Sequence, residues 1–220
     1  MIAIAIDGPA GAGKSTIARR AAAELGYIYV DTGALYRSIA WYMTAKKIEP
    51  KETEALFDAL KQLEVRLDFV NGEQHVFVLE QDVTGLIRTP EISMAASAFS
   101  ALPAVRAFLL ELQRDISRKN NVIMDGRDIG TVVLPDAKIK IFLTASAEVR
   151  AKRRYKELLE KNHPAVYEEV LAEINERDYN DAHRPIAPLK PSEDSVLVDT
   201  SELSLEESIE ALLRVIRERL

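Results

Sequence analysis

Residues 2–16 read Ile-Ala-Ile-Ala-Ile-Asp-Gly-Pro-Ala-Gly-Ala-Gly-Lys-Ser-Thr, and this stretch decides the fold class. The apolar run Ile2–Ile6 is typical of a strand that is buried on both faces of a parallel sheet. Glycines then interrupt regular structure, and from Lys14 to Leu25 apolar residues recur at helical spacing. Gly26 ends that pattern. The stretch therefore predicts a strand, a glycine loop and a helix in direct succession.

Residues 8–15 fit the phosphate-loop pattern of Gly, four residues, Gly-Lys and Ser or Thr. Such glycines let successive backbone N–H groups turn inward around phosphates, and the helix N-terminus adds the positive end of its dipole. Lys14 is expected to reach the β- and γ-phosphates of ATP, and the Ser15 hydroxyl to hold Mg²⁺. We predict a nucleoside triphosphate site formed by Gly8, Pro9, Ala10, Gly11, Ala12, Gly13, Lys14, Ser15 and Thr16.

The remainder of the chain continues the alternation of strands and helices. Further apolar runs at Tyr27–Val30, Val122–Met124, Ile139–Leu143 and Val196–Val198 are strand candidates. Together with the first strand they predict an α/β fold of about five parallel strands with helices on both faces. Helical spacing recurs over residues 90–101, 103–119, 146–160, 164–179 and 203–220.

Residues 64–87 break this alternation. Apolar residues alternate with polar ones over 65–69 and again over 76–78, and Asn71-Gly72 separates the two runs. Asn-Gly between alternating runs is a strong signal for a β-hairpin. We therefore predict a small antiparallel subdomain inserted into the α/β fold.

The composition bounds the function classes. The chain has 220 residues, 47% hydrophobic and 29% charged, as expected for one soluble globular domain. It has no cysteine, which excludes disulfides and cysteine nucleophiles, and its three histidines lie far apart. The net charge of −6 argues against bulk nucleic-acid binding, so any anion site is local.

No apolar stretch approaches the ~20 residues that span a bilayer, and no basic segment precedes the first apolar run. We therefore expect a cytoplasmic protein with no membrane partner. Nothing in the sequence indicates a large exposed apolar seam, so a monomer is expected.

A second anion site is predicted beside the phosphate loop. The segment Asp31-Thr-Gly-Ala-Leu-Tyr-Arg37 follows the second strand, and Asp125-Gly-Arg-Asp-Ile-Gly130 follows the third. The carboxyl ends of parallel strands are where ligands bind in open α/β sheets. Arg37 and Arg127 can each fork onto an acceptor phosphate, although each could instead form an ordinary ion pair. Two anion sites favour a small kinase; the chain also has no Asn-Lys-x-Asp guanine motif of a GTPase.

Two further charged clusters follow. Residues 150–156 hold five cations in seven positions of a predicted helix, either to meet an anion or as a solvated face. Arg177, Asp181 and Arg184 share one helix face if the helix extends that far, although a surface ion pair is the alternative.

These residues together resemble the bacterial cytidylate kinases, within the nucleoside monophosphate kinase family. The resemblance covers essentially the whole chain and rests on residues 8–16, 31–37, 125–130, 139–146 and 177–191. It implies a P-loop kinase that transfers the γ-phosphoryl group of ATP to CMP or dCMP. The inserted hairpin agrees, because bacterial members carry an insert in the monophosphate-binding region.

The resemblance also implies a role for each cluster. By this resemblance, the acceptor phosphate would be surrounded by Thr32, Arg37 and Arg127, and cytosine by Ser97, Arg106 and Asp128. The sugar and phosphate side would be contacted by Arg177, Asp181 and Arg184. A lid over the triphosphate would contain Arg150, Arg153 and Arg154. The catalytic residues it implies are Lys14, Arg127, Arg153 and Arg177.

The implied organisation is a single domain over residues 1–220. Its core covers 1–31, 120–149 and 166–220, its monophosphate-binding region with the insert covers 32–119, and its lid covers 150–165. Two alternatives stay open at this stage. One is another small-acceptor kinase of this fold, acting on AMP, shikimate or dephospho-coenzyme A; the other is a non-catalytic sensor that binds ATP.

Overall fold

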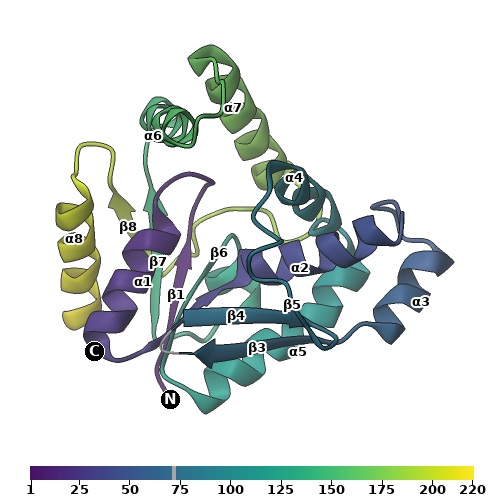
Figure 1. The fold of residues 1–220 in the computed structure, drawn as a ribbon. Helices are drawn as coiled ribbons and strands as arrows, with labels where there is room; N and C mark the ends of the chain where they lie inside the picture. Colours follow the sequence, from purple (N-terminus) through teal and green to yellow (C-terminus); the bar gives the residue numbers. More distant parts are fainter. Residues whose placement is uncertain (71–72) are drawn as a thin grey trace.

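A parallel sheet forms the centre of the computed structural model, which describes residues 1–70 and 73–220 (Figure 1). The strands lie in the order β2-β6-β1-β7-β8, and every pair is parallel. This confirms the predicted five-stranded α/β fold. The strands are β1 (Ala3–Asp7), β2 (Ile28–Asp31), β6 (Val122–Gly126), β7 (Ile139–Thr144) and β8 (Val196–Asp199).

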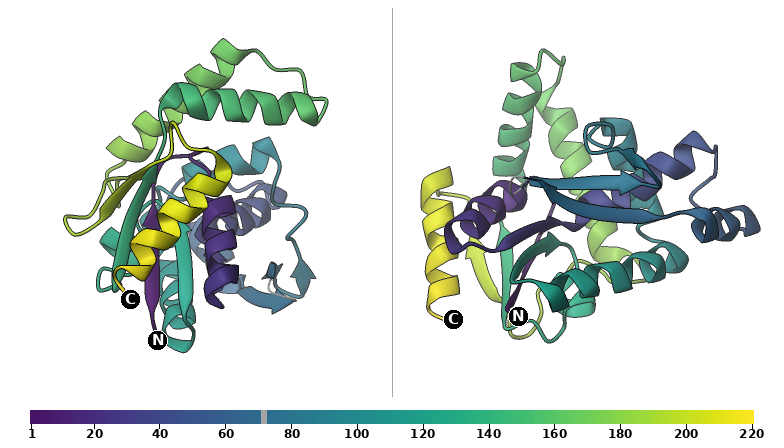
Figure 2. Two further views of the ribbon diagram at one scale, coloured as in Figure 1. Left: turned by 90° about the vertical axis from the view of Figure 1, so that its left-hand side faces the viewer. Right: turned by 60° about the horizontal axis from the view of Figure 1, so that its bottom comes forward.

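Helices cover both faces of this sheet (Figure 2). Side chains alternate between faces along a strand, so Ile4 and Ile6 of β1 share one face while Ala5 points to the other. The first face packs against α1 (Lys14–Leu25) and α8 (Leu205–Arg217). The second face packs against α5 (Pro103–Lys119) and the short π-helix η1 (Ile129–Val133).

The predicted hairpin is confirmed as part of a separate antiparallel sheet, β3-β4-β5, although its Asn71-Gly72 turn lies outside the described residues. A second apolar core joins this sheet to the helices beside it. One of them, α3, was not expected from the sequence. The elements are β3 (Val65–Val70), β4 (Glu73–Val78), β5 (Gln81–Asp82), α2 (Thr32–Ala45), α3 (Glu54–Gln62) and α4 (Pro90–Phe99).

Two helices, α6 (Ala147–Glu160) and α7 (Tyr167–His183), stand above the carboxyl ends of the central strands (Figure 1). They pack on each other through a small apolar cluster of their own. Helix α7 continues four residues beyond the predicted end and stops at His183. Arg184 is therefore not on the helix face of Arg177 and Asp181: its backbone is extended, as favoured for a residue before proline.

Among the described residues, no single helix is long and apolar enough to cross a membrane. Helices α4 and α5 reach that length and composition only together, and their axes are bent by 99°.

Candidate active site

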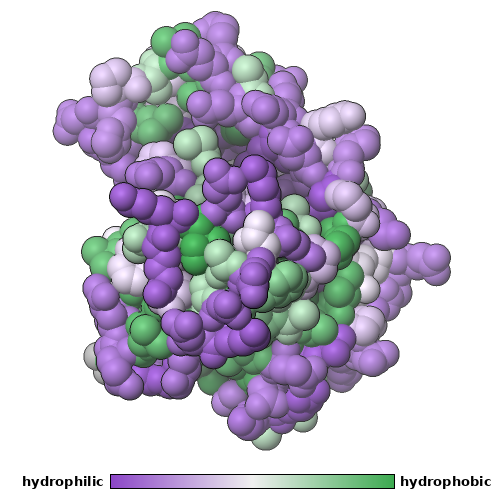
Figure 3. Space-filling view, turned by 90° about the vertical axis from the view of Figure 1, so that its right-hand side faces the viewer, coloured by the Kyte–Doolittle hydropathy of each residue, from purple (hydrophilic) through white to green (hydrophobic). Residues whose placement is uncertain are grey.

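A cavity of about 500 Å³ lies at the carboxyl ends of the central strands, beneath α6 and α7. In the space-filling view the surface is hollowed between these two helices and the rest of the molecule (Figure 3). The cavity is lined by residues from the phosphate loop, α2, α4, the loop after β6, α6 and α7. All site residues predicted from the sequence line it except Gly8, Pro9 and Ala12.

Those three residues shape the phosphate loop from behind. Gly8 has a φ of +154°, and a Cβ there would lie 1.9 Å from the carbonyl oxygen of Leu143, so only glycine fits. The Pro9 carbonyl accepts a hydrogen bond of 2.8 Å from Lys14 Nζ, and Ala12 is fully buried in the core. Gly13 caps α1 without a side-chain hydrogen bond, which leaves the helix N-terminus open to an anion.

Burial shifts the pKa values of the charged groups beneath this loop. Burial, reinforced by the charge of Arg127, lowers the pKa of Lys14 to about 7. Burial likewise raises the pKa of Asp125 to about 6, with the charge of Asp31 adding to the effect. Burial destabilises the charged form of Lys14, and a phosphate bound beside it would stabilise that form.

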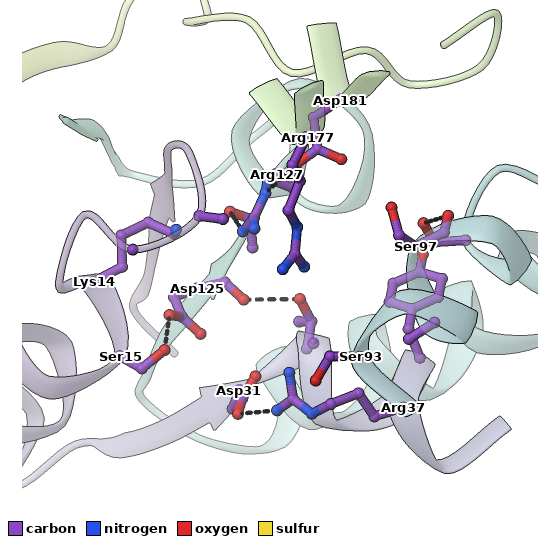
Figure 4. A pocket seen from close by; sticks show the side chains of 18 of the residues that line it. Lys14, Ser15, Asp31, Arg37, Ser93, Ser97, Asp125, Arg127, Arg177 and Asp181 are labelled. Atoms are coloured by element: carbon purple, nitrogen blue, oxygen red, sulfur yellow. Dashed lines mark hydrogen bonds and ion pairs between the residues drawn. The ribbon is translucent and has the colours of Figure 1, made fainter. Parts of the chain in front are cut away.

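Ser15 and Asp125 bring two hard oxygen groups together beside the loop. Ser15 Oγ donates to Asp125 Oδ2 at 2.9 Å (Figure 4). Tyr29 Oη donates to Asp125 Oδ1 at 3.1 Å. Hydroxyl and carboxylate oxygens suit Mg²⁺, which takes few protein ligands and completes its shell with phosphates and water. Within residues 1–70 and 73–220, no group of three or more His, Cys, Asp or Glu side chains could hold a metal.

Asp7 connects the strand before the phosphate loop to the π-helix. Its two carboxylate oxygens accept hydrogen bonds from Ile129 N at 2.7 Å and Gly130 N at 2.8 Å. Burial raises the pKa of Asp7 to about 6. Because η1 begins directly after Arg127 and Asp128, this contact fixes the loop that presents both side chains to the cavity.

The predicted acceptor-phosphate residues lie opposite the phosphate loop. Thr32 Oγ1 donates to the Asp125 carbonyl at 2.7 Å, and Arg37 donates to the Asp31 carboxylate at 2.7 Å. The same Asp31 side chain caps α2 through Ala34 N at 3.0 Å. Arg37 Nε is buried without a hydrogen-bond partner. Arg37 is thus held by one carboxylate and has further donors to offer.

Arg177 of α7 and Arg127 of the loop after β6 reach into the cavity side by side (Figure 4). Arg127 Nε donates to Asp181 at 2.8 Å, whereas the buried Nε of Arg177 has no partner. Burial and the charge of Arg127 lower the pKa of Arg177. An arginine that is buried without its full set of partners fits an anionic ligand.

The predicted base-reading residues form a charged cluster at the other end of the cavity. Asp128 is paired with Arg106 and, at 3.3 Å, with Arg184. Burial raises the pKa of Asp128 even though these arginines oppose the shift. Ser97 of α4 lines the same end. The structure thus brings together residues that lie 87 positions apart in the chain.

The three arginines predicted to lie in a lid differ in their surroundings. Arg150 is buried and donates to Asp178 at 2.5 and 3.0 Å and to the Ala10 carbonyl at 3.1 Å. Arg153 donates to the Thr200 carbonyl at 2.8 Å, and Arg154 pairs with Glu157 on the helix surface. Arg150 therefore joins α6, α7 and the phosphate loop.

Several residues of the site were not predicted from the sequence. Asp31 and Asp125 lie inside motifs that were quoted from the sequence. Their position at the carboxyl end of a strand was the signal that could have identified them as site residues. The side chains of Asp7, Tyr29 and Asp178 gave none, because each acts on a partner distant in the chain. Further cavity residues that were not predicted are Gly33, Tyr36, Ser93, Ala96, Ser100, Gly126 and Glu157.

Comparisons with solved structures agree with the fold. Shikimate kinase from Bacteroides thetaiotaomicron superposes with a TM-score of 0.50 at 13% identity, covering 98% of both chains. A gluconokinase from Sinorhizobium meliloti gives a TM-score of 0.50 at 14% identity, covering 99% of this chain and 93% of that one. At these identities the likeness concerns the P-loop kinase fold alone.

The proteins found by sequence comparison are much more similar to this chain than these structures are. The family model described as Cytidylate kinase matches residues 4–218. A cytidylate kinase of Caldicellulosiruptor saccharolyticus is 48% identical over 214 residues, covering 97% of this chain and 95% of that protein. The cytidylate kinase of Thermosipho melanesiensis is 48% identical over 216 residues, covering 98% and 97%. The chain belongs to the cytidylate kinase family.

Proposed function

We propose that the protein transfers the γ-phosphoryl group of ATP to CMP or dCMP, which yields ADP and CDP or dCDP. One observation carries the proposal: a single cavity has a phosphate loop on one side, Arg37 on the other, and Arg127 and Arg177 between them (Figure 4). These are sites for two phosphate-bearing ligands that face each other. Family membership and the names of the relatives support CMP as the acceptor.

The reaction needs no general base, because the acceptor phosphate is largely ionised near neutral pH. The protein must instead hold two polyanions close together and offset their repulsion. Lys14 lies on the donor side, and Arg127 and Arg177 lie between the two sides (Figure 4). We assign these three to charge stabilisation, with Arg153 added from the lid.

Mg²⁺ fits beside the phosphate loop. Ser15 Oγ and the Asp125 carboxylate, 2.9 Å apart, would hold it together with phosphate oxygens and water. When bound, the ion neutralises charge on the β- and γ-phosphates. Tyr29 keeps the Asp125 carboxylate turned toward Ser15 through its hydrogen bond to the other oxygen.

Selection of cytosine is assigned to Asp128, Arg106 and Ser97. A carboxylate accepts from the exocyclic amine of cytosine, while a guanidinium donates to its ring acceptors. Uracil would place a carbonyl against Asp128, and an unpaired buried acceptor costs ~1–3 kcal/mol. Asp128 and Arg106 are already paired, so the base meets an ordered donor–acceptor edge.

The proposed lid closes over ATP and excludes water that would otherwise hydrolyse it. Its boundaries of 150–165, and those of the core and monophosphate-binding region, stay as predicted. The separate apolar cluster of the insert region supports the boundaries of the monophosphate-binding region. The cluster between α6 and α7 instead crosses the boundary between lid and core at residue 165. The packing of α7 on α6 favours a lid that carries α7, with Arg177 and Asp181, along with it.

The family assignment argues against a kinase for AMP, shikimate or dephospho-coenzyme A, and against a non-catalytic sensor. We propose that the protein acts as a monomer in the cytoplasm, with no nucleic-acid or membrane partner. Its net charge of −6 and its small-molecule cavity support that assignment. Light scattering at assay concentrations tests the monomer.

Product identification tests the reaction. Incubation with CMP, Mg²⁺ and γ-³²P-labelled ATP should move the label to CDP, as resolved by chromatography. Label released only as inorganic phosphate would show an ATPase, and no loss of ATP with any acceptor would favour the sensor. Lys14→Ala is the matched negative control, because it removes the charge and leaves the loop backbone.

A further inference from the structure

The inserted sheet turns one nearly apolar face toward α2 and the edge of the central sheet. Residues directly paired in an antiparallel ladder point to the same side, so the register of β3 and β4 defines this face. Its residues Leu67 and Phe69 pack against the cluster that contains Val30 and Met124. The complete face is Val65, Leu67, Phe69, Gln74, Val76 and Val78.

Gln74 is the one polar residue of that face. Its side chain meets the backbone of Asp31 at two points: Asp31 N donates to Gln74 Oε1 at 2.8 Å, and Gln74 Nε2 donates to the Asp31 carbonyl at 3.2 Å. β2, which ends at Asp31, is an edge strand of the central sheet. The glutamine amide therefore forms the hydrogen bonds to the exposed edge of β2 that a neighbouring strand would otherwise form.

Asp31, the residue that Gln74 contacts, supports the proposed acceptor side of the cavity. Asp31 Oδ1 caps α2, and Asp31 Oδ2 accepts the hydrogen bond of Arg37. Thr32, the next residue, is fixed from the core by its hydrogen bond to the Asp125 carbonyl. The backbone that orients Arg37 is thus held from the core at Thr32 and from the insert at Gln74.

Within the described residues, these two hydrogen bonds are the only ones between β3–β5 and the central sheet. The remaining contact is apolar packing, which is not directional. Gln74 therefore supplies the directional link between the insert and the acceptor site. We infer that Gln74 is a positioning residue that orients Asp31, and through it Arg37, for the acceptor phosphate. This inference rests on the proposed function.

Steady-state kinetics of Gln74→Leu test it, with ATP and CMP varied separately. Leucine keeps the volume and the apolar face but cannot pair with Asp31. We expect the KM for CMP to rise roughly 2- to 10-fold, the range for one to two lost hydrogen bonds, while the KM for ATP stays within twofold. Gln74→Glu should act in the same direction, because its carboxylate keeps the acceptor for Asp31 N but opposes the Asp31 carbonyl.

Gln81→Leu is the matched control, an exposed glutamine on β5 of the same inserted sheet, and it should leave both KM values unchanged. Hydrogen exchange should also show faster exchange at the Asp31 amide in Gln74→Leu than in Gln81→Leu. A fall in kcat with an unchanged KM for CMP would show a purely structural role and overturn the inference.

The two proposals fail differently. If the unmodified protein does not phosphorylate CMP, the proposed function fails. If it does so and Gln74→Leu retains the KM for CMP and the exchange rate of the Asp31 amide, only the role of Gln74 fails. A melting temperature measured for each variant separates misfolding from both outcomes.

Discussion

The two sides of the cavity are built in different ways. The proposed donor side is one continuous segment, residues 8–16, which offers backbone N–H groups and the uncapped N-terminus of α1. The acceptor side collects side chains from β2, α2, α4, α5, the loop after β6 and α7, and pairs nearly every carboxylate with an arginine. A backbone site recognises any triphosphate tail, whereas an assembly of paired side chains can discriminate one base from another.

This difference sets what substitutions can do. Side-chain changes on the donor side should affect the rate with every acceptor alike. Changes on the acceptor side should affect the ratio between acceptors. The following predictions test this contrast, from the largest expected effect to the smallest.

Lys14→Ala should lower kcat by about 10²–10³, because it removes the charge that offsets the phosphates in a buried site. The loss should be the same with CMP and dCMP. Lys190→Ala, an exposed lysine, is the control. Turnover of Lys14→Ala near that of the control would remove the basis for the donor-side assignment.

Asp128→Asn should lower the kcat/KM ratio of CMP to UMP by roughly 10- to 100-fold, because the acceptor that faces the cytosine amine becomes partly a donor. Competition assays with both nucleotides measure the ratio directly. An equal fall for CMP and UMP would show that Asp128 holds Arg106 and Arg184 in place without reading the base.

Tyr29→Phe should raise the Mg²⁺ concentration needed for half-maximal activity by roughly 2- to 10-fold, because the hydrogen bond that orients Asp125 is lost while the ring stays. Mg²⁺ titrations at saturating substrates measure this. Tyr27→Phe is the control, since Tyr27 packs beside α1 without that contact. Superimposable titration curves for the two variants would refute a role for the Tyr29 hydroxyl.

Binding of ATP should take up about one proton at pH 8. The pKa of Lys14 is about 7 in the free protein, so the amine is mostly neutral at pH 8 and becomes charged when phosphates raise its pKa. The uptake should shrink toward pH 6, where Lys14 is already protonated. Calorimetry in buffers of different ionisation enthalpy measures it, and Lys14→Met should abolish it. Equal uptake in both proteins would contradict this origin.

The strand, glycine loop and helix over residues 3–25 were predictable from the sequence because they are local. The helix predicted from Lys14 to Leu25 is confirmed at both ends, since Gly13 and Gly26 adopt the left-handed backbone that bounds it. The hairpin strands were predictable for the same reason. The family resemblance is also confirmed.

The rest depends on tertiary contacts that no local pattern records. Asp7 looked like the end of an apolar run, yet its carboxylate holds η1, 122 residues away. Gln74 lies between the turn and the second alternating run, outside the quoted pattern, and its partner lies 43 residues earlier. Arg184 continued a helical spacing, but Pro185 ends the helix first. The roles of the individual site residues stay predictions.

The central claim is that a general donor site faces an acceptor site that reads cytosine. A coupled ADP-release assay with ATP and Mg²⁺, run in parallel on CMP, dCMP, UMP and AMP, tests it most directly. We predict rapid turnover of CMP and dCMP, with kcat/KM for UMP lower by about one order of magnitude or more and little turnover of AMP. Turnover of AMP or UMP at or above that of CMP would contradict the account.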